Sequence, residues 1–315
     1  MYSLESTLEK ALEEIQDAAN SENGLSGLAT GYKELDRLLN GLERGDLIVI
    51  GGRPCMGKTQ LLINLAYNMA KSGVPISFYS FEFTNPQIIK LLISKVGNLN
   101  IDKIKSGRLL NEEDNNLHKA CKELEELPLF LIENPPSYID ELIKAIKEDV
   151  KNQKPEVVII DYIQLLRAKP LLQNRYEEIS SFTREIKNLA RELNIPIIIS
   201  SQLNRNTENR EDKKPQMFDL RDSGSICEDA NIVMLLHRPE YYTRSHQDGE
   251  GNDIRGLLYL SVEKNHMGPR GEIKLKFDPS KCLITEWTDS YLDYFRGQDK
   301  DYNNMDKREL EDPPF

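Results

Sequence analysis

Residues 46–60 read DLIVIGGRPCMGKTQ, and this stretch decides the fold of the chain. The apolar run at 47–50 leads into a glycine pair and then into Gly57, Lys58 and Thr59, so residues 52–59 satisfy the pattern G-x-x-x-x-G-K-[ST]. In this setting a buried strand ends in a loop of backbone N–H groups, and the helix that follows directs its positive end at the same point. The stretch therefore predicts a phosphate-binding loop within an α/β fold.

The phosphate-binding loop predicts a nucleotide and a metal ion. Gly52 and Gly57 leave room for the backbone to wrap the phosphates. Lys58 is expected to reach the β and γ phosphates, and the hydroxyl of Thr59 is expected to bind Mg²⁺. We expect a nucleotide with a γ phosphate and Mg²⁺ as cofactors, with the nucleotide bound by Gly52, Arg53, Pro54, Cys55, Met56, Gly57, Lys58, Thr59 and Gln60.

Acidic and amide side chains follow three further strand-like runs. Asp161, in EVVIIDY, fits the acid that completes a Mg²⁺ site; the alternative is a strand-end acid that faces solvent. Glu82, in FYSFEF, is placed to orient an attacking water, or else to cap the helix that starts near Pro86. Gln202 ends PIIISSQ and can bond a γ phosphate. Because parallel strands end at one edge of a sheet, we expect these side chains around the loop.

The pattern beyond the loop predicts a mostly parallel central sheet flanked by helices. Short apolar runs alternate with helical stretches at 59–71, 86–96, 138–150 and 176–193, which is typical of β-α-β units. After NIVMLLHR, at 231–238, the helical periodicity stops. Two alternating runs, GLLYLSV and EIKLKFD, then flank EKNHMGPRG at 263–271 and predict antiparallel strands with a β-hairpin at the C-terminal edge.

The two ends of the chain differ from its middle. Leu4, Leu8, Leu12 and Ile15 recur at helical spacing and predict an amphipathic helix over 3–19, whose apolar stripe packs either on its own domain or on a neighbouring copy. Residues 288–315 are polar and are expected to be mobile. Residues 1–23 hold six acids against one base and residues 288–315 hold eight against four, so these ends carry most of the net charge of −11. The middle can therefore still hold a local basic groove.

Composition excludes several classes of protein. No apolar run approaches the roughly 20 residues of a membrane span, and the N-terminus lacks the basic and then apolar pattern of a signal peptide. The 4 cysteines are scattered without a CxxC pair, which fits neither a zinc site nor a disulfide framework. We expect a globular cytoplasmic protein with reduced thiols and no membrane partner.

From about residue 24 to residue 287, the motifs resemble the C-terminal motor domain of replicative DnaB-type DNA helicases, with its RecA-like ATPase core. The resemblance rests on TGYKELDRLLNGL, RPCMGKT, FYSFEF, DYIQLL, EIKNLARELNIPIIISSQLNR, DLRDSGSICEDANIVMLLHR and the KN..GP.G hairpin. It implies a RecA-like P-loop NTPase fold over 24–287, a linker helix over 1–23 and a tail over 288–315. The family's N-terminal helical domain has no counterpart in this sequence, so we expect the chain to lack it.

The resemblance also implies that the nucleotide is ATP, and it implies roles for the residues around it. Lys58 and Thr59 would bind phosphate and Mg²⁺, while Glu82 would be the catalytic base, Asp161 the Walker B acid and Gln202 the coupling glutamine. The family forms six-membered rings that move 5′ to 3′ on single-stranded DNA and hold nucleotide between subunits; primase and a helicase loader would be further partners. The DNA backbone would be contacted by Arg221, Asp222, Ser223 and Gly224, although Asp222 or Ser223 also suits a helix N-cap.

The hairpin departs from the family pattern. The family places a lysine there and, two residues later, an arginine, and both reach the γ phosphate of a neighbouring subunit. Lys264 matches the lysine, but His266 stands where the arginine is expected. The role could fall to Lys264, to a protonated His266 or to Arg270, and we expect Lys264 and Arg270 to share it.

Two alternatives to a helicase motor follow from the sequence. A recombinase-like ATPase would use the same core, but RPCMGKT together with DLRDSGSI favours the helicase. A nucleotide-gated single-stranded DNA-binding module with weak hydrolysis would explain His266, whereas the presence of Glu82 argues against it.

Overall fold

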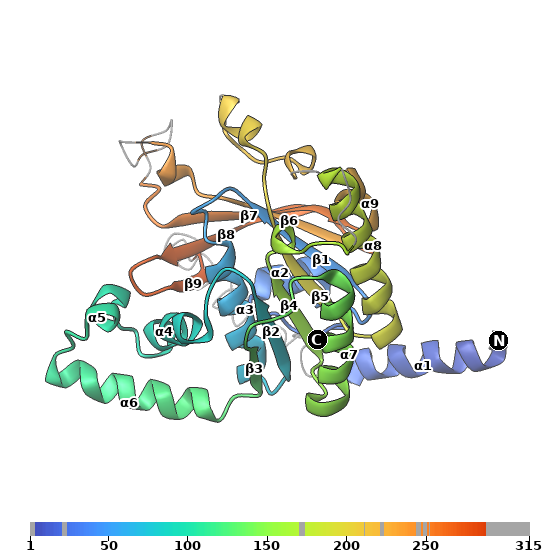
Figure 1. The fold of residues 1–315 in the computed structure, drawn as a ribbon, viewed down its shortest axis with the longest axis horizontal. Coiled ribbons are helices and arrows are strands. Elements are labelled where there is room, and N and C mark those ends of the chain that lie inside the picture. Colours follow the sequence, from blue (N-terminus) through green and yellow to red (C-terminus); the bar gives the residue numbers. More distant parts are fainter. Residues whose placement is uncertain are drawn as a thin grey trace, which may run out of the picture.

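The computed structural model describes residues 4–20, 24–169, 174–210, 212–220, 224–243, 247, 251 and 253–287. A single sheet of nine strands runs through the described chain in the order β3-β2-β4-β5-β1-β6-β7-β8-β9 (Figure 1). The strands are β1 (Leu47–Gly52), β2 (Ile76–Ser80), β3 (Leu129–Ile132), β4 (Val157–Asp161), β5 (Ile197–Gln202), β6 (Ile232–His237), β7 (Leu257–Asn265), β8 (Gly271–Asp278) and β9 (Leu283–Glu286).

The direction of the strands confirms the predicted fold class. From β3 to β6 every neighbouring pair is parallel. From β6 to β9 every pair is antiparallel, and β7 and β8 form the predicted hairpin. The helices are α1 (Leu4–Asn20), α2 (Lys33–Leu39), α3 (Lys58–Lys71), α4 (Asn85–Val96), α5 (Ile101–Ser106), α6 (Asn111–Glu125), α7 (Ile139–Gln153), α8 (Arg175–Leu193) and α9 (Gly224–Asp229).

Alternation along the buried strands divides the core into two layers. In β1, Ile48 and Ile50 pack in the cluster that contains the apolar residues of α2, α3 and α4. Leu47 and Val49 face the other way and pack with α7, α8 and α9. All four side chains are fully buried, because a parallel sheet covered on both faces needs apolar residues at every position. This is why the strand sequences are continuously apolar.

The predicted helices agree closely with α3, α4, α7 and α8, and only α7 extends well beyond its predicted end, to Gln153. The sequence analysis did not predict α5 and α6, which lie between α4 and β3. In Figure 1 they form an arm at one side of the molecule. Ala120 is the single buried residue among those of α6, so this helix lacks the broad apolar stripe by which a helix is recognised.

Helix α1 extends away from the sheet and its covering helices (Figure 1). Its stripe is exposed, at 77% for Leu4, 54% for Leu8, 56% for Leu12 and 64% for Ile15. Of the two alternatives for this stripe, packing on its own domain is wrong. Residues 288–315, expected to be a mobile tail, lie outside the described residues. Among the described helices, none combines the length and the apolar character needed to cross a membrane.

Candidate nucleotide site

Register in the sheet gathers the predicted catalytic residues at one edge. Gly52 at the end of β1 lies level with Gln202 at the end of β5, and Ser80 at the end of β2 lies level with Asp161 at the end of β4. Glu82 follows two residues after Ser80. A pocket of about 270 Å³ at this edge is lined by Pro54, Cys55, Gly57, Lys58, Thr59, Gln60, Glu82, Phe83, Tyr162 and Gln202.

The loop after β1 has the geometry expected of a phosphate-binding loop. Gly57 has a φ of +97°, which a residue with a side chain adopts only with strain. Lys58 bends back over the loop, and its Nζ donates to the carbonyl oxygens of Gly52 at 3.0 Å and Arg53 at 3.3 Å. Burial lowers the pKa of Lys58, and the charges of Asp161 and Glu82 act against that shift. The ammonium group is thus held at the loop, where a bound phosphate would be its anionic partner.

Two loop residues have side chains outside the pocket. Met56 is 1% exposed and packs in the core between the sheet and α3. Met56 could therefore contact a phosphate only through its backbone, and its place in the nucleotide site stays a prediction. Arg53 points into a neighbouring pocket and contacts the segment that follows β5.

Asp161 and Thr59 form a candidate magnesium site. Asp161 is fully buried, so the alternative of a solvent-facing acid is wrong. Its carboxylate accepts hydrogen bonds from Thr59 Oγ1 at 2.6 Å and from Ser200 Oγ. Burial raises the pKa of Asp161, and the two hydroxyl groups act to lower it. One carboxylate and one hydroxyl suit Mg²⁺, which takes most of its other oxygen ligands from phosphates and water. The described residues contain no cluster of three or more His, Cys, Asp or Glu that could hold a metal alone.

Glu82 stands exposed at the pocket. Burial of part of the carboxyl group, together with the charge of Asp161, raises its pKa, while Lys58 lowers it. A raised pKa makes a carboxylate a better proton acceptor. The alternative role as a helix cap is filled by Thr84 and Gln87, which form a capping box at the start of α4. Glu82 is therefore free for the predicted role of catalytic base.

The structure adds three residues that the sequence analysis missed. Ser200 binds Asp161, as described above. Gln164 connects the segment after β4 to the last two residues of β5. Its Oε1 accepts a hydrogen bond from the backbone N of Gln202 at 3.2 Å, and its Nε2 donates to Ser201 Oγ at 2.8 Å. Arg238, after β6, donates to the carbonyl oxygen of Cys55 at 3.1 Å. All three residues lie inside motifs quoted above, Gln164 in DYIQLL, Ser200 in EIKNLARELNIPIIISSQLNR and Arg238 at the end of DLRDSGSICEDANIVMLLHR, but these motifs did not indicate the contacts.

The basic residues of the hairpin lie toward the opposite edge of the sheet. Lys264 pairs with Val233 in β6, whereas Gly52 lies level with Leu236. This offset of three residues corresponds to about 10 Å along the strands, and the backbone N of His266 lies further back, donating to Asn231 O. Lys264 Nζ donates to the carbonyl oxygens of Cys227 at 2.7 Å and Glu228 at 3.0 Å. Lys264 and the backbone of His266 thus lie away from the phosphate loop of their own chain.

The predicted DNA-contacting residues are only partly within the structure. Arg221, Asp222 and Ser223 lie outside the described residues. Gly224 is the first residue of α9. Leu220, just before these residues in the sequence, is 2% exposed and forms a bridge with Leu203. Leu220 is therefore anchored to the chain that follows β5.

A comparison with family models supplies the deciding observation. Residues 27–286 match the model of the DnaB-like helicase C-terminal domain. The chain belongs to the DnaB-like helicase family. This DnaB-like domain is 40% identical over 262 residues to a probable replicative DNA helicase of Trieres chinensis, covering 82% of this chain and 57% of the relative. It is 33% identical to the replicative DNA helicase DnaB of Geobacillus stearothermophilus, covering 86% of this chain and 59% of that protein. The chain thus spans less than two thirds of the length of these relatives.

Solved structures agree with the family and with the RecA-like fold. The DnaB-like domain superposes on a solved ATPase domain with a TM-score of 0.83 and 29% identity, over 91% of this chain and 100% of that one. A DnaB-like replicative helicase, solved in a study of its interactions with primase, gives a TM-score of 0.79 and 30% identity over 91% of this chain and 68% of that chain.

Proposed function

We propose that this DnaB-like domain is the ATP-hydrolysing motor of a replicative DNA helicase. The observation that carries the proposal is the division of the catalytic set between two edges of the sheet. Lys58, Glu82 and Asp161 gather at one edge, and Lys264 lies toward the other. A single chain therefore contributes one part to each of two sites, and a neighbouring copy has to supply the other part of each site.

In this proposal each residue has a chemical task. Lys58 and the loop amides bind the phosphates of ATP, and Glu82 accepts the proton of the attacking water. Thr59 and Asp161 hold Mg²⁺, which when bound neutralises charge on the transferred phosphoryl group. Gln202 bonds the γ phosphate and senses its release. Lys264 and Arg270 of one copy stabilise the developing charge at the site of the next, as a finger supplied in trans does.

The proposal includes a hexameric ring around single-stranded DNA. The exposed stripe of α1 supports it, because four large apolar side chains in a row need a covering surface. We assign residues 1–23 as a linker helix that docks on a neighbour, 24–287 as the motor and 288–315 as a tail. The loop with Arg221, Asp222, Ser223 and Gly224 would bind the DNA backbone while the ring moves 5′ to 3′ and unwinds the duplex. Replication would place the domain in the cytoplasm, with primase and a loader as further partners.

A second candidate is a nucleotide-gated DNA-binding module with weak hydrolysis. It is favoured by His266 in the hairpin and by Lys264, whose ammonium group is already bound to two carbonyl oxygens of its own chain. A finger tied down in this way has to be released before it can serve a neighbour. The recombinase-like alternative is not supported, because residues 27–286 match the model of the DnaB-like helicase C-terminal domain.

The test is ATP turnover per chain as protein concentration rises, with and without single-stranded DNA, with Lys58→Ala as the blank. The motor proposal expects turnover per chain to climb with concentration and to rise further with DNA. Turnover that stays flat at the level of the blank, while ATP still binds, would overturn it in favour of the gated module.

A further inference from the structure

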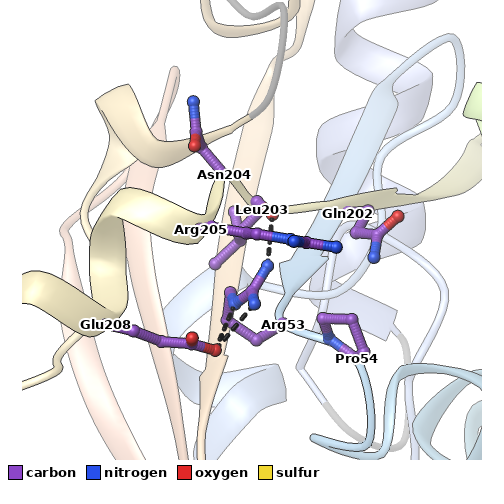
Figure 2. Close-up of a pocket in the computed structure, with 7 residues that line it drawn as sticks. All are labelled: Arg53, Pro54, Gln202, Leu203, Asn204, Arg205 and Glu208. Atoms are coloured by element: carbon purple, nitrogen blue, oxygen red, sulfur yellow. Dashed lines mark hydrogen bonds and ion pairs between the residues drawn. The ribbon is translucent and has the colours of Figure 1, made fainter.

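Arg53, in the phosphate loop, forms hydrogen bonds with residues that lie outside the nucleotide pocket. Figure 2 shows Arg53 joined by dashed lines to Glu208 and Leu203, beside a pocket of about 520 Å³. Arg53 Nε and Nη2 both donate to Glu208 Oε1, at 3.0 and 2.6 Å. Arg53 Nη1 donates to the carbonyl oxygen of Leu203 at 3.1 Å. The side chain of Arg53 is 10% exposed, so the guanidinium group is held in one orientation.

Glu208 belongs to a small unit that leads to the predicted DNA loop. It lies in η2 (Arg205–Asn209), and the chain on both sides of η2 is tied to Asp219 in η3 (Met217–Asp219). The backbone N of Asn204 donates to Asp219 O at 2.7 Å, and Arg210 Nη1 donates to Asp219 Oδ1 at 2.9 Å. Asp219 is 2% exposed. These hydrogen bonds connect the residues that flank η2, in which Glu208 lies, to Asp219, which stands two residues before Arg221 in the sequence.

The same unit begins at the coupling glutamine. Gln202 is held through its backbone N by Gln164, and the next carbonyl group, that of Leu203, is held by Arg53. The phosphate loop is therefore hydrogen-bonded to Leu203, the residue next to the glutamine that would sense phosphate. An arginine that donates several hydrogen bonds fixes the orientation of its acceptors as well as their distance. A shift of the phosphate loop would therefore move Leu203 and Glu208 with it.

We infer that Glu208 is a positioning residue whose ion pair with Arg53 couples the phosphate loop to the residues around Asp219, and so couples nucleotide binding to DNA binding. This inference rests on the proposed function. Coupling between two ligands is reciprocal, so nucleotide should tighten DNA binding by the same factor by which DNA tightens nucleotide binding. Glu208 contacts neither ligand in this scheme, and its loss should reduce that factor while each separate affinity is kept.

The test compares Glu208→Gln, which removes the charge and keeps the shape, with Glu208→Asp, which keeps the charge. Glu192→Gln is the matched control, because Glu192 pairs with Lys147 between α8 and α7, outside the loop network described above. Affinity for a fluorescent oligo-dT strand is measured with and without a non-hydrolysable ATP analogue, and affinity for the analogue is measured with and without the strand.

In the wild-type protein and in Glu192→Gln we expect the same coupling factor, within the roughly 5- to 150-fold range usual for such coupling. In Glu208→Gln we expect that factor to fall toward one, with the affinity for the analogue alone changed by less than about threefold, and Glu208→Asp should restore part of it. A Glu208→Gln protein with the wild-type factor overturns the inference and leaves the motor proposal intact. Equal weakening of all affinities with an unchanged factor means a merely structural role and also overturns it. A wild-type protein without coupling removes both the inference and the DNA-dependent motor on which it rests.

Discussion

Replacing Ser200 with alanine tests the electrostatics of the candidate magnesium site. Ser200 and Asp161 are both fully buried, and the serine hydroxyl donates to the carboxylate. A hydrogen bond to a charged group contributes about 1.5–3 kcal/mol, and removing the donor leaves the buried charge with one partner fewer. We expect Ser200→Ala to lower the free energy of unfolding by about 1.5–3 kcal/mol at neutral pH, and to raise the pKa of Asp161 further, because one hydroxyl that lowers it is removed.

The expected pH dependence has a definite sign. Burial raises the pKa of Asp161 above its usual value, so the folded state carries a cost for the charged form at neutral pH, and this cost disappears as pH falls through the folded pKa. Loss of Ser200 increases that cost. The difference between the two proteins should therefore be largest at neutral pH and shrink as Asp161 becomes protonated, toward the roughly 0.5–1.5 kcal/mol of a bond between neutral groups.

The assay is urea unfolding at neutral and at acidic pH, with Ser77→Ala as the control. Ser77 is also fully buried, but its hydroxyl oxygen has no hydrogen-bond partner among the described residues. Removal of an unpaired buried hydroxyl should be neutral or stabilising. A loss in Ser200→Ala below about 0.5 kcal/mol at neutral pH, or one that grows at acidic pH, would refute the reasoning.

Two further predictions concern the nucleotide site. Arg270→Ala should reduce ATP turnover by about tenfold or more while ATP binding is kept. This loss is smaller than the 10³–10⁵-fold effect of an unshared arginine finger, because Lys264 remains. Steady-state kinetics measure the effect, and unchanged turnover would remove Arg270 from the role. The exposed thiol of Cys55 lines the pocket, so ATP should slow its alkylation by a maleimide, with Cys121 as an internal reference; equal rates with and without ATP would place the thiol outside the bound nucleotide.

Much of the candidate site could be predicted because its elements are local. The phosphate loop is a contiguous pattern, and Asp161 and Gln202 each end a continuously apolar strand. A parallel sheet brings such strand ends to one edge whatever the order of its strands. Helices with a broad apolar stripe, such as α8, were predicted for the same reason, whereas α6, with one buried residue, was missed.

Local sequence patterns predicted the fold class, the phosphate loop and the residues at the carboxyl edge, since periodicity and motif spacing are properties of neighbouring residues. Contacts between distant segments were needed to show that Met56 belongs to the core, that Gln164 bonds Ser201 and Ser200 bonds Asp161, and that Arg53 binds Glu208, 155 residues further along the chain. The tertiary structure also placed Lys264 far from the phosphate loop of its own chain. The physical reason is that these contacts depend on strand order and register, which arise from packing between distant segments, and no local pattern encodes them.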